Sequence, residues 1–382
     1  MSDIGFNDDV KAYGRKFHIQ TASQRAKGTA SVEVVEGGRV ISKSYLTYER
    51  RSENDEAKME SRIRKIVESV HKENKTELEL LYVIADKIDN MGHAASHVKL
   101  GLLFIRNNLT QDAIKQFNKA ININPNEISA YNNLGIAFIK SKEYQKAVKI
   151  LQKAMAMEPG YADVHLNLGL AYHYERQLHK GLDEIQKALS INPDYLIARY
   201  HLAIIYLDSI IIDKNDKQLP EPNVRVERAI QQLKTLIMLG VNGMVDILSK
   251  VQKALIAKDT ESAVKQLLSS TERLFPEEFH NIIGVDFYLK FMYGGRGLSR
   301  RALKKFEMNL LEAIKIQEDY ADLWNNLGIV HLIQCRNLFL QALSEFNQAL
   351  EINPKFAKAI KNTKLVEIDG KEFLILLKEI LK

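Results

Sequence analysis

Apolar and polar residues follow two different rhythms along the chain. In residues 17–21, 30–35 and 39–45 they alternate at every second position, and Gly37 and Gly38 separate the last two of these segments. Such alternation is typical of half-buried β-strands, and a pair of glycines between two strands favours a hairpin. Beyond residue 53 the apolar residues recur every three or four positions, which is the spacing of an amphipathic helix. The pattern predicts a mainly α-helical chain with a small β-rich cap at residues 1–52.

Residues 53–93 are rich in glutamate and lysine, and Met59, Ile63 and Val67 fall on one helical face within them. Charged residues at such spacing usually cover the solvated side of a helix. We therefore expect charged helices here that lead from the cap into the rest of the chain.

A period of 34 residues runs through the next segment. A leucine followed by a small residue recurs at this interval, and so do a later alanine and a proline: Leu100-Gly101, Leu134-Gly135, Leu168-Gly169 and Leu202-Ala203; Ala120, Ala154 and Ala188; Pro125, Pro159 and Pro193. The small residue lets a second helix approach closely, and the proline ends that second helix. One such hairpin leaves apolar faces uncovered, so consecutive hairpins are expected to stack into a superhelix with a concave and a convex side.

Residues 94–195 resemble three gap-free units of the tetratricopeptide repeat family, and their Asn-Asn-Leu-Gly opening is similar to that of bacterial members. The resemblance implies a right-handed α-solenoid over residues 94–240, with a fourth repeat expanded by an insertion at 208–223. Residues 241–320 keep helical spacing but match the repeat poorly, so we expect degenerate helical hairpins there. A last repeat and C-terminal capping helices are expected in residues 321–382. This repeat carries Leu327-Gly328, Ala342, Phe346 and Pro354, with two extra residues in its turn.

Composition narrows the class of protein. The 382 residues include 54 Lys and Arg, 48 Asp and Glu, and a single cysteine. The charges are interspersed, which argues against a concentrated nucleic-acid-binding surface, and one cysteine forms neither an internal disulfide nor a thiolate zinc site. No run of 18 apolar residues is present, and the amino terminus lacks an apolar signal region. We therefore expect a cytoplasmic protein without a transmembrane segment.

Enzymatic motifs do not stand out. The sequence has no Walker-type loop, no strand-linked dinucleotide fingerprint, no HExxH and no GxSxG. Residues 294–299 are glycine-rich and precede basic residues, but without the P-loop lysine–hydroxyl pair they are best interpreted as a turn. His93 and His97 have metal-ligand spacing without a third ligand nearby, so packing is the favoured role. We predict no catalytic residues, no cofactor and no metal site, and hence no enzyme.

The family resemblance places a ligand in the concave groove, which the first helix of each hairpin lines. Family members often carry an asparagine before the Leu-Gly pair, where it can bond the backbone of an extended peptide. The aliphatic residues that follow each pair suit a peptide or an amphipathic helix. The predicted groove residues are Lys99, Leu102, Arg106, Asn132, Asn133, Ile136, Lys140, Asn167, Leu170, Tyr174, Tyr200, His201 and Asn326.

These features predict a non-enzymatic adaptor or scaffold that binds a peptide segment or amphipathic helix of a protein partner. Two alternatives stay open. In one, the chain assembles with its own copies into a homo-oligomeric scaffold, because an apolar groove also attracts segments of another copy. In the other, the repeats recruit partners for an activity in residues 1–52 or 241–320 that no motif reveals.

Overall fold

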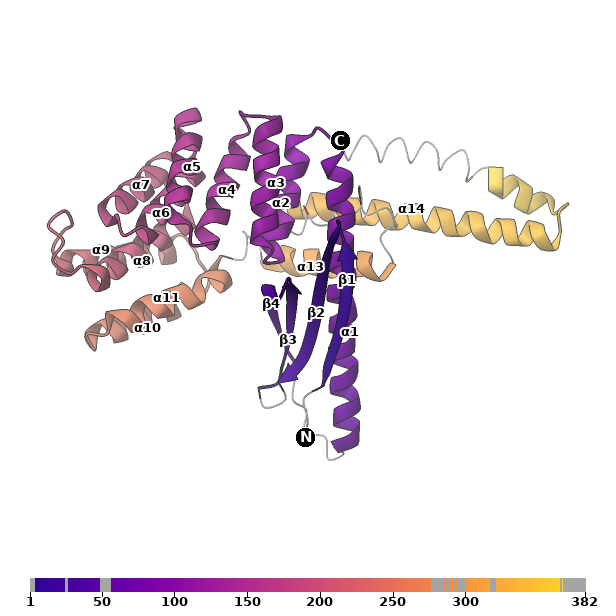
Figure 1. Cartoon of the computed structure of the whole chain (residues 1–382), viewed down its shortest axis with the longest axis horizontal. Coiled ribbons are helices and arrows are strands. Elements are labelled where there is room, and N and C mark those ends of the chain that lie inside the picture. Colours follow the sequence, from indigo (N-terminus) through magenta and orange to yellow (C-terminus); the bar gives the residue numbers. More distant parts are fainter. Residues whose placement is uncertain are drawn as a thin grey trace. The chain divides into compact units, whose positions relative to one another are not determined.

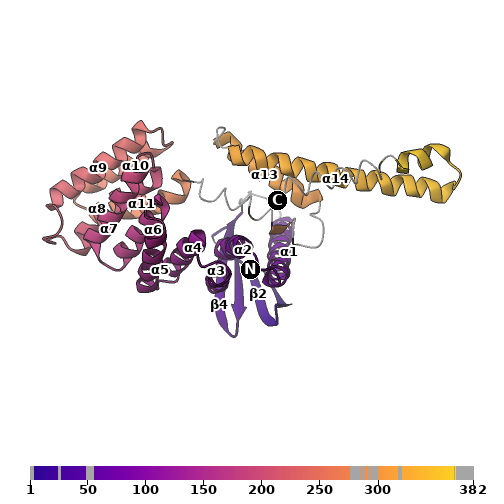
Figure 2. The ribbon, with the colours of Figure 1, turned by 90° about the horizontal axis from the view of Figure 1, so that it is seen from above.

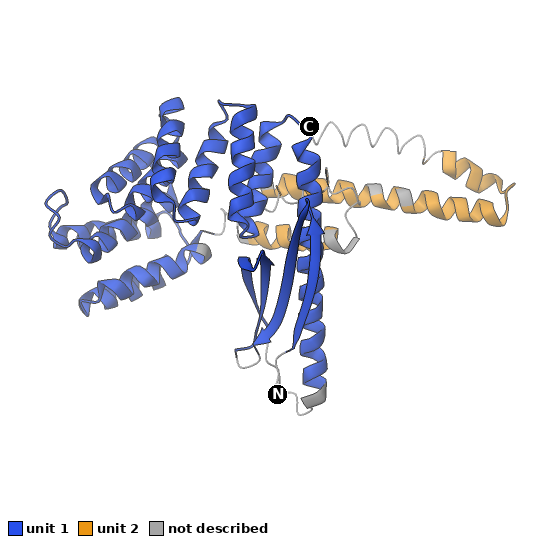
Figure 3. Cartoon of the chain, viewed as in Figure 1, with its two compact units in different colours: residues 1–278 blue, residues 279–382 orange. Residues whose placement is uncertain are grey.

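The computed structural model describes residues 4–24, 27–48, 56–275, 285, 289–290, 293, 300–316, 321–364 and 366. Its strands and helices are labelled in Figure 1. They divide into two compact units, residues 1–278 and 279–382, which Figure 3 colours separately. The glycine-rich turn expected at 294–299 lies outside the described residues, as do residues 367–382 of the expected capping helices.

The amino-terminal segment is a four-stranded antiparallel sheet, which confirms the predicted small β-sheet. Its strands, β1 (Gly5–Ala12), β2 (Arg15–Gln24), β3 (Thr29–Glu36) and β4 (Arg39–Thr47), pair in the order β1-β2-β3-β4. The predicted hairpin is β3–β4, and both turn glycines have positive φ angles, 54° and 77°, which favour glycine. Strand β1 was not predicted, because Asp8-Asp9 interrupts the alternation of apolar and polar residues.

Helix α1 (Glu56–Asp89) lies along this sheet and contacts β1, β2 and β3. Its Ile63 and Val67 form a buried cluster with Ile4 and Ala30 of the amino-terminal segment. Where several charged helices were expected, the structure has a single 34-residue helix that reaches almost to the first repeat. It therefore serves as the apolar cover of the sheet as well as the connection.

The 34-residue period forms helical hairpins that lie side by side in two perpendicular views (Figures 1 and 2). They are α2 (Ala94–Arg106) with α3 (Thr110–Ile123), α4 (Ile128–Lys140) with α5 (Tyr144–Met157), and α6 (Ala162–Tyr174) with α7 (Leu178–Ile191). A Cβ atom added to Gly101, Gly135 or Gly169 would lie 2.3–2.5 Å from a side chain sixteen residues later. The repeated glycine is thus required for close approach of the two helices of each hairpin.

The fourth hairpin consists of α8 (Leu196–Ile212) and α9 (Pro222–Met238), so helices cover both ends of the insertion expected at 208–223 and the connection between them is 213–221. The side chain of Arg225 is fully buried and donates to Ser209 Oγ and to the carbonyl of Asp213, both at 3.1 Å, and to the carbonyl of Lys214. Burial lowers its pKa. Arg225 therefore ties the start of the connecting loop to helix α9.

Helices α10 (Met244–Ile256) and α11 (Thr260–Leu274) form a further hairpin, but its second helix, α11, packs on α8. Tyr200 Oη donates to the carbonyl of Leu267 at 2.7 Å, and its ring lies 5.0 Å from that of Phe275. Because contacts reach α8 from several helices, α8 is buried on nearly all sides.

The second unit contains α13 (Arg300–Ile316) and the 32-residue helix α14 (Ala321–Ile352). Leu323, Leu327 and Val330 of α14 form a core with Phe306 and Leu310 of α13. The sequence predicted a helical hairpin over this stretch, and that prediction is wrong, because α14 continues through the expected turn (Figure 1). Residues 335–340, Cys-Arg-Asn-Leu-Phe-Leu, place three consecutive apolar residues where the regular turns are polar, and the helix is not interrupted.

Candidate binding groove

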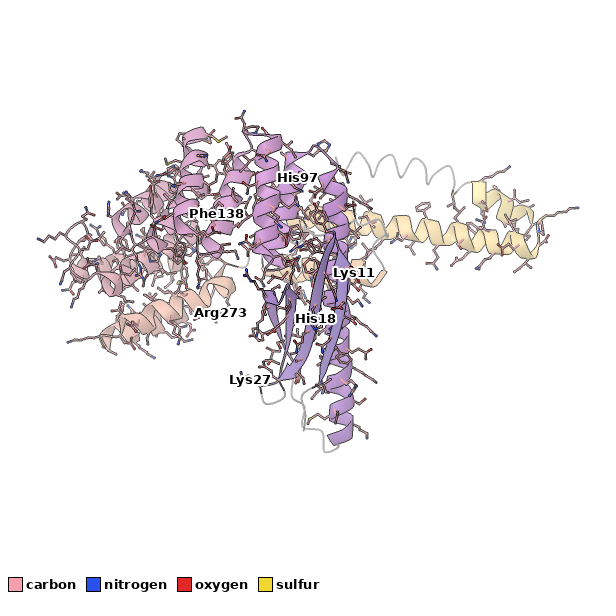
Figure 4. All side chains as sticks on the ribbon, viewed as in Figure 1. Lys11, His18, Lys27, His97, Phe138 and Arg273 are labelled. Atoms are coloured by element: carbon pink, nitrogen blue, oxygen red, sulfur yellow. The ribbon has the colours of Figure 1, made fainter. Side chains whose placement is uncertain are left out.

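Three half-buried aliphatic side chains line the first helices of the three regular hairpins. Leu102, Ile136 and Leu170 occupy equivalent positions on α2, α4 and α6, each directly after the closely packed glycine. Helix α4 contacts both α2 and α6, so the structure brings these positions onto neighbouring helices. His97 and Phe138, labelled in Figure 4, locate helices α2 and α4 in the structure. We call Leu102, Ile136 and Leu170 the aliphatic row.

The predicted asparagines hold helices together as well as bordering the groove. Asn167 Nδ2 donates to Oδ1 of the buried Asn132 at 2.9 Å, which links α6 to α4. Asn133 Nδ2 donates to the carbonyl of Ser129 at 2.8 Å within its own helix. Each amide has a second N–H and a carbonyl oxygen with which to meet a ligand, but part of its bonding capacity is engaged within the chain.

The ends of the same three helices carry a polar rim. Arg106, Lys140 and Tyr174 stand at equivalent positions and are exposed, and Tyr174 stacks on Tyr144 with ring centroids 5.3 Å apart. Burial raises the pKa of Tyr174, whereas burial lowers the pKa of Lys99, one helical turn before Leu102. A bound acidic group would favour the charged form of Lys99, and the rim is therefore suited to anionic side chains.

Two predicted groove residues of the fourth repeat stand apart from this surface. Tyr200 is fully buried beneath α11, so its assignment to the groove is wrong. His201 is partly buried, and burial together with the nearby His173 lowers its pKa to about 4, so it is neutral at pH 7. Ile204, which corresponds to the aliphatic row in this repeat, is also buried. The exposed groove therefore ends at the third hairpin.

Asn326 belongs to the second unit, on α14, and is half-buried there. It shares its sequence motif with Asn133 and Asn167 but stands on a helix that is not part of a closed hairpin. The predicted set of groove residues is thus divided between the two units.

Sequence reasoning missed a polar cluster that joins the sheet to the first repeat. Arg15 of β2 donates to Glu36 at 2.5 and 2.6 Å, to Asp112 of α3 at 2.6 Å and to Tyr82 Oη at 3.1 Å. Tyr82 Oη in turn donates to Asp112 at 2.9 Å, and burial raises the pKa of Tyr82. We call these four residues the Arg15 cluster. No sequence signal marks it, because Arg15 and Asp112 are 97 residues apart.

The histidines of the repeats have structural partners. His97 Nδ1 lies 2.6 Å from Gln116 Oε1, and His165 Nδ1 lies 2.6 Å from Glu184 Oε2. Across the described part of the chain, no three His, Cys, Asp or Glu side chains gather in a way that would hold a metal ion. Among the described helices, none has both the length and the apolar character needed to cross a bilayer.

Two surface hollows lie away from the aliphatic row. One, of about 310 Å³, is lined from α7, α8 and α9 by residues that include Gln186, Arg199 and Arg228. The other, of about 450 Å³, lies between the β1–β2 turn and α1, where Tyr13 and Val83 contribute to its walls. Neither contains a predicted groove residue.

Stacked helical hairpins with a close-packed glycine in each define a helical-repeat solenoid, a class that presents an extended surface to other molecules. Comparison with protein families matches residues 101–141 to "TPR repeat" and residues 128–161 and 162–195 to "Tetratricopeptide repeat". The chain therefore contains tetratricopeptide repeats in α2–α7, as its sequence predicts, and these repeats support a protein-interaction adaptor.

Solved structures similar to parts of this chain include MamA, residues 41 to the end, from Desulfovibrio magneticus RS-1. It shows 22% identity and a TM-score of 0.35, over 49% of this chain and 96% of that one. YrrB, titled a TPR protein with an unusual peptide-binding site, shows 16% identity and a TM-score of 0.34, over 51% and 94%. A mutant O-GlcNAc transferase from Thermobaculum terrenum shows 24% identity and a TM-score of 0.32, over 37% and 26%. No curated protein matches the chain.

Proposed function

We propose that the chain is a non-enzymatic adaptor that binds a short segment of a partner protein along the aliphatic row. The observation that carries this proposal is the repetition of a half-buried aliphatic residue on three adjacent helices, with a polar rim at the end of each. A regular row of apolar positions with a polar border fits a peptide that presents apolar side chains at regular intervals. The absence of an enzymatic activity and the cytoplasmic location stay predictions.

The closed fourth repeat limits the length of the bound segment. Neighbouring packed helices are about 9 Å apart, so three helices span about 18 Å between their axes. An extended peptide covers about 3.3 Å per residue, and about six residues would therefore reach from Leu102 to Leu170. An amphipathic helix would cover the same distance with about three turns.

The chemistry of the rim indicates the kind of partner. Arg106 and Lys140 place two basic groups one helical turn after the aliphatic row, and Lys99 places a third one turn before it on α2. A segment with two or three aliphatic anchors and interspersed acidic residues would satisfy both surfaces. Partner binding to such a rim should weaken as the salt concentration rises, because exposed charges are screened.

A selection experiment tests this proposal. A library of random 12-residue peptides displayed on phage is selected on the full chain, and the enriched peptides are synthesised with a fluorescent label. Their affinities are measured by fluorescence anisotropy for the unaltered chain and for Ile136→Ala/Leu170→Ala. Loss of two buried aliphatic contacts should weaken binding at least tenfold, because each contributes about 1–2 kcal/mol.

A matched control uses the opposite helices of the same hairpins. Lys149→Ala and Lys153→Ala alter exposed positions of α5 and should leave the affinity within about twofold. Enriched peptides that bind the groove variant and the unaltered chain equally would contradict the proposal.

A further inference from the structure

The hollow of about 310 Å³ between α7, α8 and α9 has no carboxylate among its lining residues. These three helices lie side by side in both views of the chain (Figures 1 and 2). The lining consists of two leucines and six polar residues, which are Gln186, Arg199, Tyr206, Arg228, Gln231 and Gln232. Two arginines without an acid give the lining a charge of about +2 at pH 7. We call this hollow the arginine hollow.

Contacts between the three helices hold the polar lining in place. Arg199 Nη1 donates to Gln232 Oε1 at 3.1 Å, which joins α8 to α9. One helical turn before Gln232, the guanidinium of Arg228 lies over the ring of Tyr206, 5.9 Å from its centroid. Gln186 Nε2 donates to Tyr206 Oη at 3.0 Å and so adds α7 to the chain of contacts. Both guanidinium groups are therefore positioned at the same hollow.

The hydrogen bonds within the hollow occupy acceptors and leave donors. Gln232 Oε1 accepts from Arg199, and Tyr206 Oη accepts from Gln186. Each Nη of Arg199 carries a second N–H, the Gln232 amide has two N–H groups, and the Tyr206 hydroxyl has its own hydrogen. Among the described residues, neither Arg199 nor Arg228 forms an ion pair with a carboxylate. Such a set of donors favours an anionic ligand.

The preceding repeat contains the same framework. There, Gln152 Nε2 donates to Tyr172 Oη at 2.8 Å, and Lys180 Nζ lies 5.5 Å from the centroid of the same ring. The tyrosine, the glutamine that bonds it and the cation over its ring thus recur from one repeat to the next. The two sites can therefore be compared position by position.

The charges of the two sites differ. In α7, Asp183 and Glu184 follow Lys180 by three and four positions, and Glu184 Oε2 lies 2.6 Å from His165 Nδ1. In α9, the residues at the same intervals after Arg228 are the two glutamines of the hollow. The earlier site supplies its own carboxylates, whereas the later site has lost both and has kept its cations. An external anion would replace them.

We propose that the arginine hollow binds a phosphate monoester. Such a group carries a charge of about −1.5 to −2 at pH 7, which matches two guanidinium groups, and its oxygens accept paired N–H bonds from arginine. A volume of about 310 Å³ is at the lower end of ligand pockets, so the bound group is small. The monoester belongs either to a small phosphorylated compound or to a phosphorylated side chain. The proposal does not depend on what the aliphatic row binds.

Binding to the full chain is measured with two probes. Phenyl phosphate, followed by saturation-transfer NMR, should bind and should be displaced by inorganic phosphate. Benzoate has the same ring but a single charge, and it should bind about tenfold more weakly. A six-residue peptide with one phosphoserine, compared with its unphosphorylated form, distinguishes the two sources. Phosphopeptide binding tighter than that of phenyl phosphate indicates a phosphorylated side chain, and equal binding indicates a small compound.

Variants locate the site. Arg228→Gln removes an exposed cation and should weaken phenyl phosphate binding about tenfold. Gln232→Glu introduces the carboxylate of the preceding repeat next to Arg199 and should weaken binding by a similar factor, because an internal anion then competes with the ligand. The matched control Lys180→Gln removes the corresponding cation of the earlier site and should leave the affinity within about twofold. Melting temperatures establish that each variant is folded.

Three results would overturn the proposal. The first is an unaltered chain that binds neither phenyl phosphate nor the phosphoserine peptide. The second is benzoate binding as tight as that of phenyl phosphate. The third is an equal loss from Lys180→Gln and Arg228→Gln, which would indicate general attraction to a basic surface. The groove variant Ile136→Ala/Leu170→Ala should bind phenyl phosphate normally, so failure of the proposed peptide groove and failure of the arginine hollow are distinguishable.

Discussion

In the hairpin α4–α5, Leu151 lies over Gly135, whereas no atom of the described residues lies within 4 Å of the corresponding position over Gly328 in α14. The turn of α4–α5 holds Lys142 at a φ of 61°, a left-handed conformation that costs a non-glycine residue about 1 kcal/mol. Neighbouring hairpins on both sides supply contacts that offset this cost. Among the labelled helices, α14 contacts α13. The comparison teaches that the repeat motif permits a closed hairpin and that stacking on both sides stabilises it.

The largest expected difference between the two regions concerns the side chain that meets the glycine. Phe117→Ala should lower the free energy of unfolding by about 4 kcal/mol, because Phe117 is fully buried over Gly101. Phe346→Ala should lower it by about 2 kcal/mol or less, because Phe346 is only half-buried. Urea unfolding of the full chain followed by circular dichroism measures both, and equal losses would break the comparison.

How far the sequence predicts the fold depends on whether contacts are local or distant. The 34-residue period was sufficient for α2–α7, because each close contact joins residues sixteen positions apart. The packing of α11 on α8 was not predictable, since Tyr200 and Leu267 meet across 67 residues without a shared motif. Leu102, Ile136 and Leu170 lie on neighbouring first helices for the same local reason, whereas that distant contact buries Tyr200.

An intermediate effect is expected from pH at the closed end of the groove. The pKa of His201 is about 4 in the folded chain, against about 6.5 when unfolded, so the unfolded state binds the proton first as pH falls. His201 should not affect the free energy of unfolding above pH 6.5. As the pH falls from 6.5 to 4, the free energy of unfolding should decrease by about 2 kcal/mol once partial solvent exposure is considered.

The check is thermal unfolding at a series of pH values for the unaltered chain and for His201→Gln. The variant should lose part of this dependence on pH, because glutamine does not titrate. His93, which precedes α2, is exposed, and His93→Gln is the matched control that should leave the pH profile unchanged. A profile that is the same for all three proteins would contradict the assignment to His201.

The smallest expected effect has opposite signs in the two regions. Gly328→Ala should stabilise the chain by about 1 kcal/mol, because alanine is the better helix former and no described atom lies within 4 Å of its Cβ. Gly135→Ala should destabilise the chain, since its Cβ would lie 2.4 Å from Leu151 Cγ. Hydrogen exchange of the two helices, measured by mass spectrometry in dilute solution, reports both signs. Slower exchange in both variants would show that the two glycines have equivalent surroundings.

The Arg15 cluster has a consequence for any truncation of the protein. A fragment that began at the first repeat would remove the guanidinium and phenol partners of Asp112 and expose its carboxylate, which is buried in the intact chain. It would also uncover Phe104, which packs against the ring of Tyr82 at 5.5 Å. The sheet and α1 are therefore the end plate of the solenoid, and a binding study on the repeats in isolation would examine a surface that the intact protein does not expose.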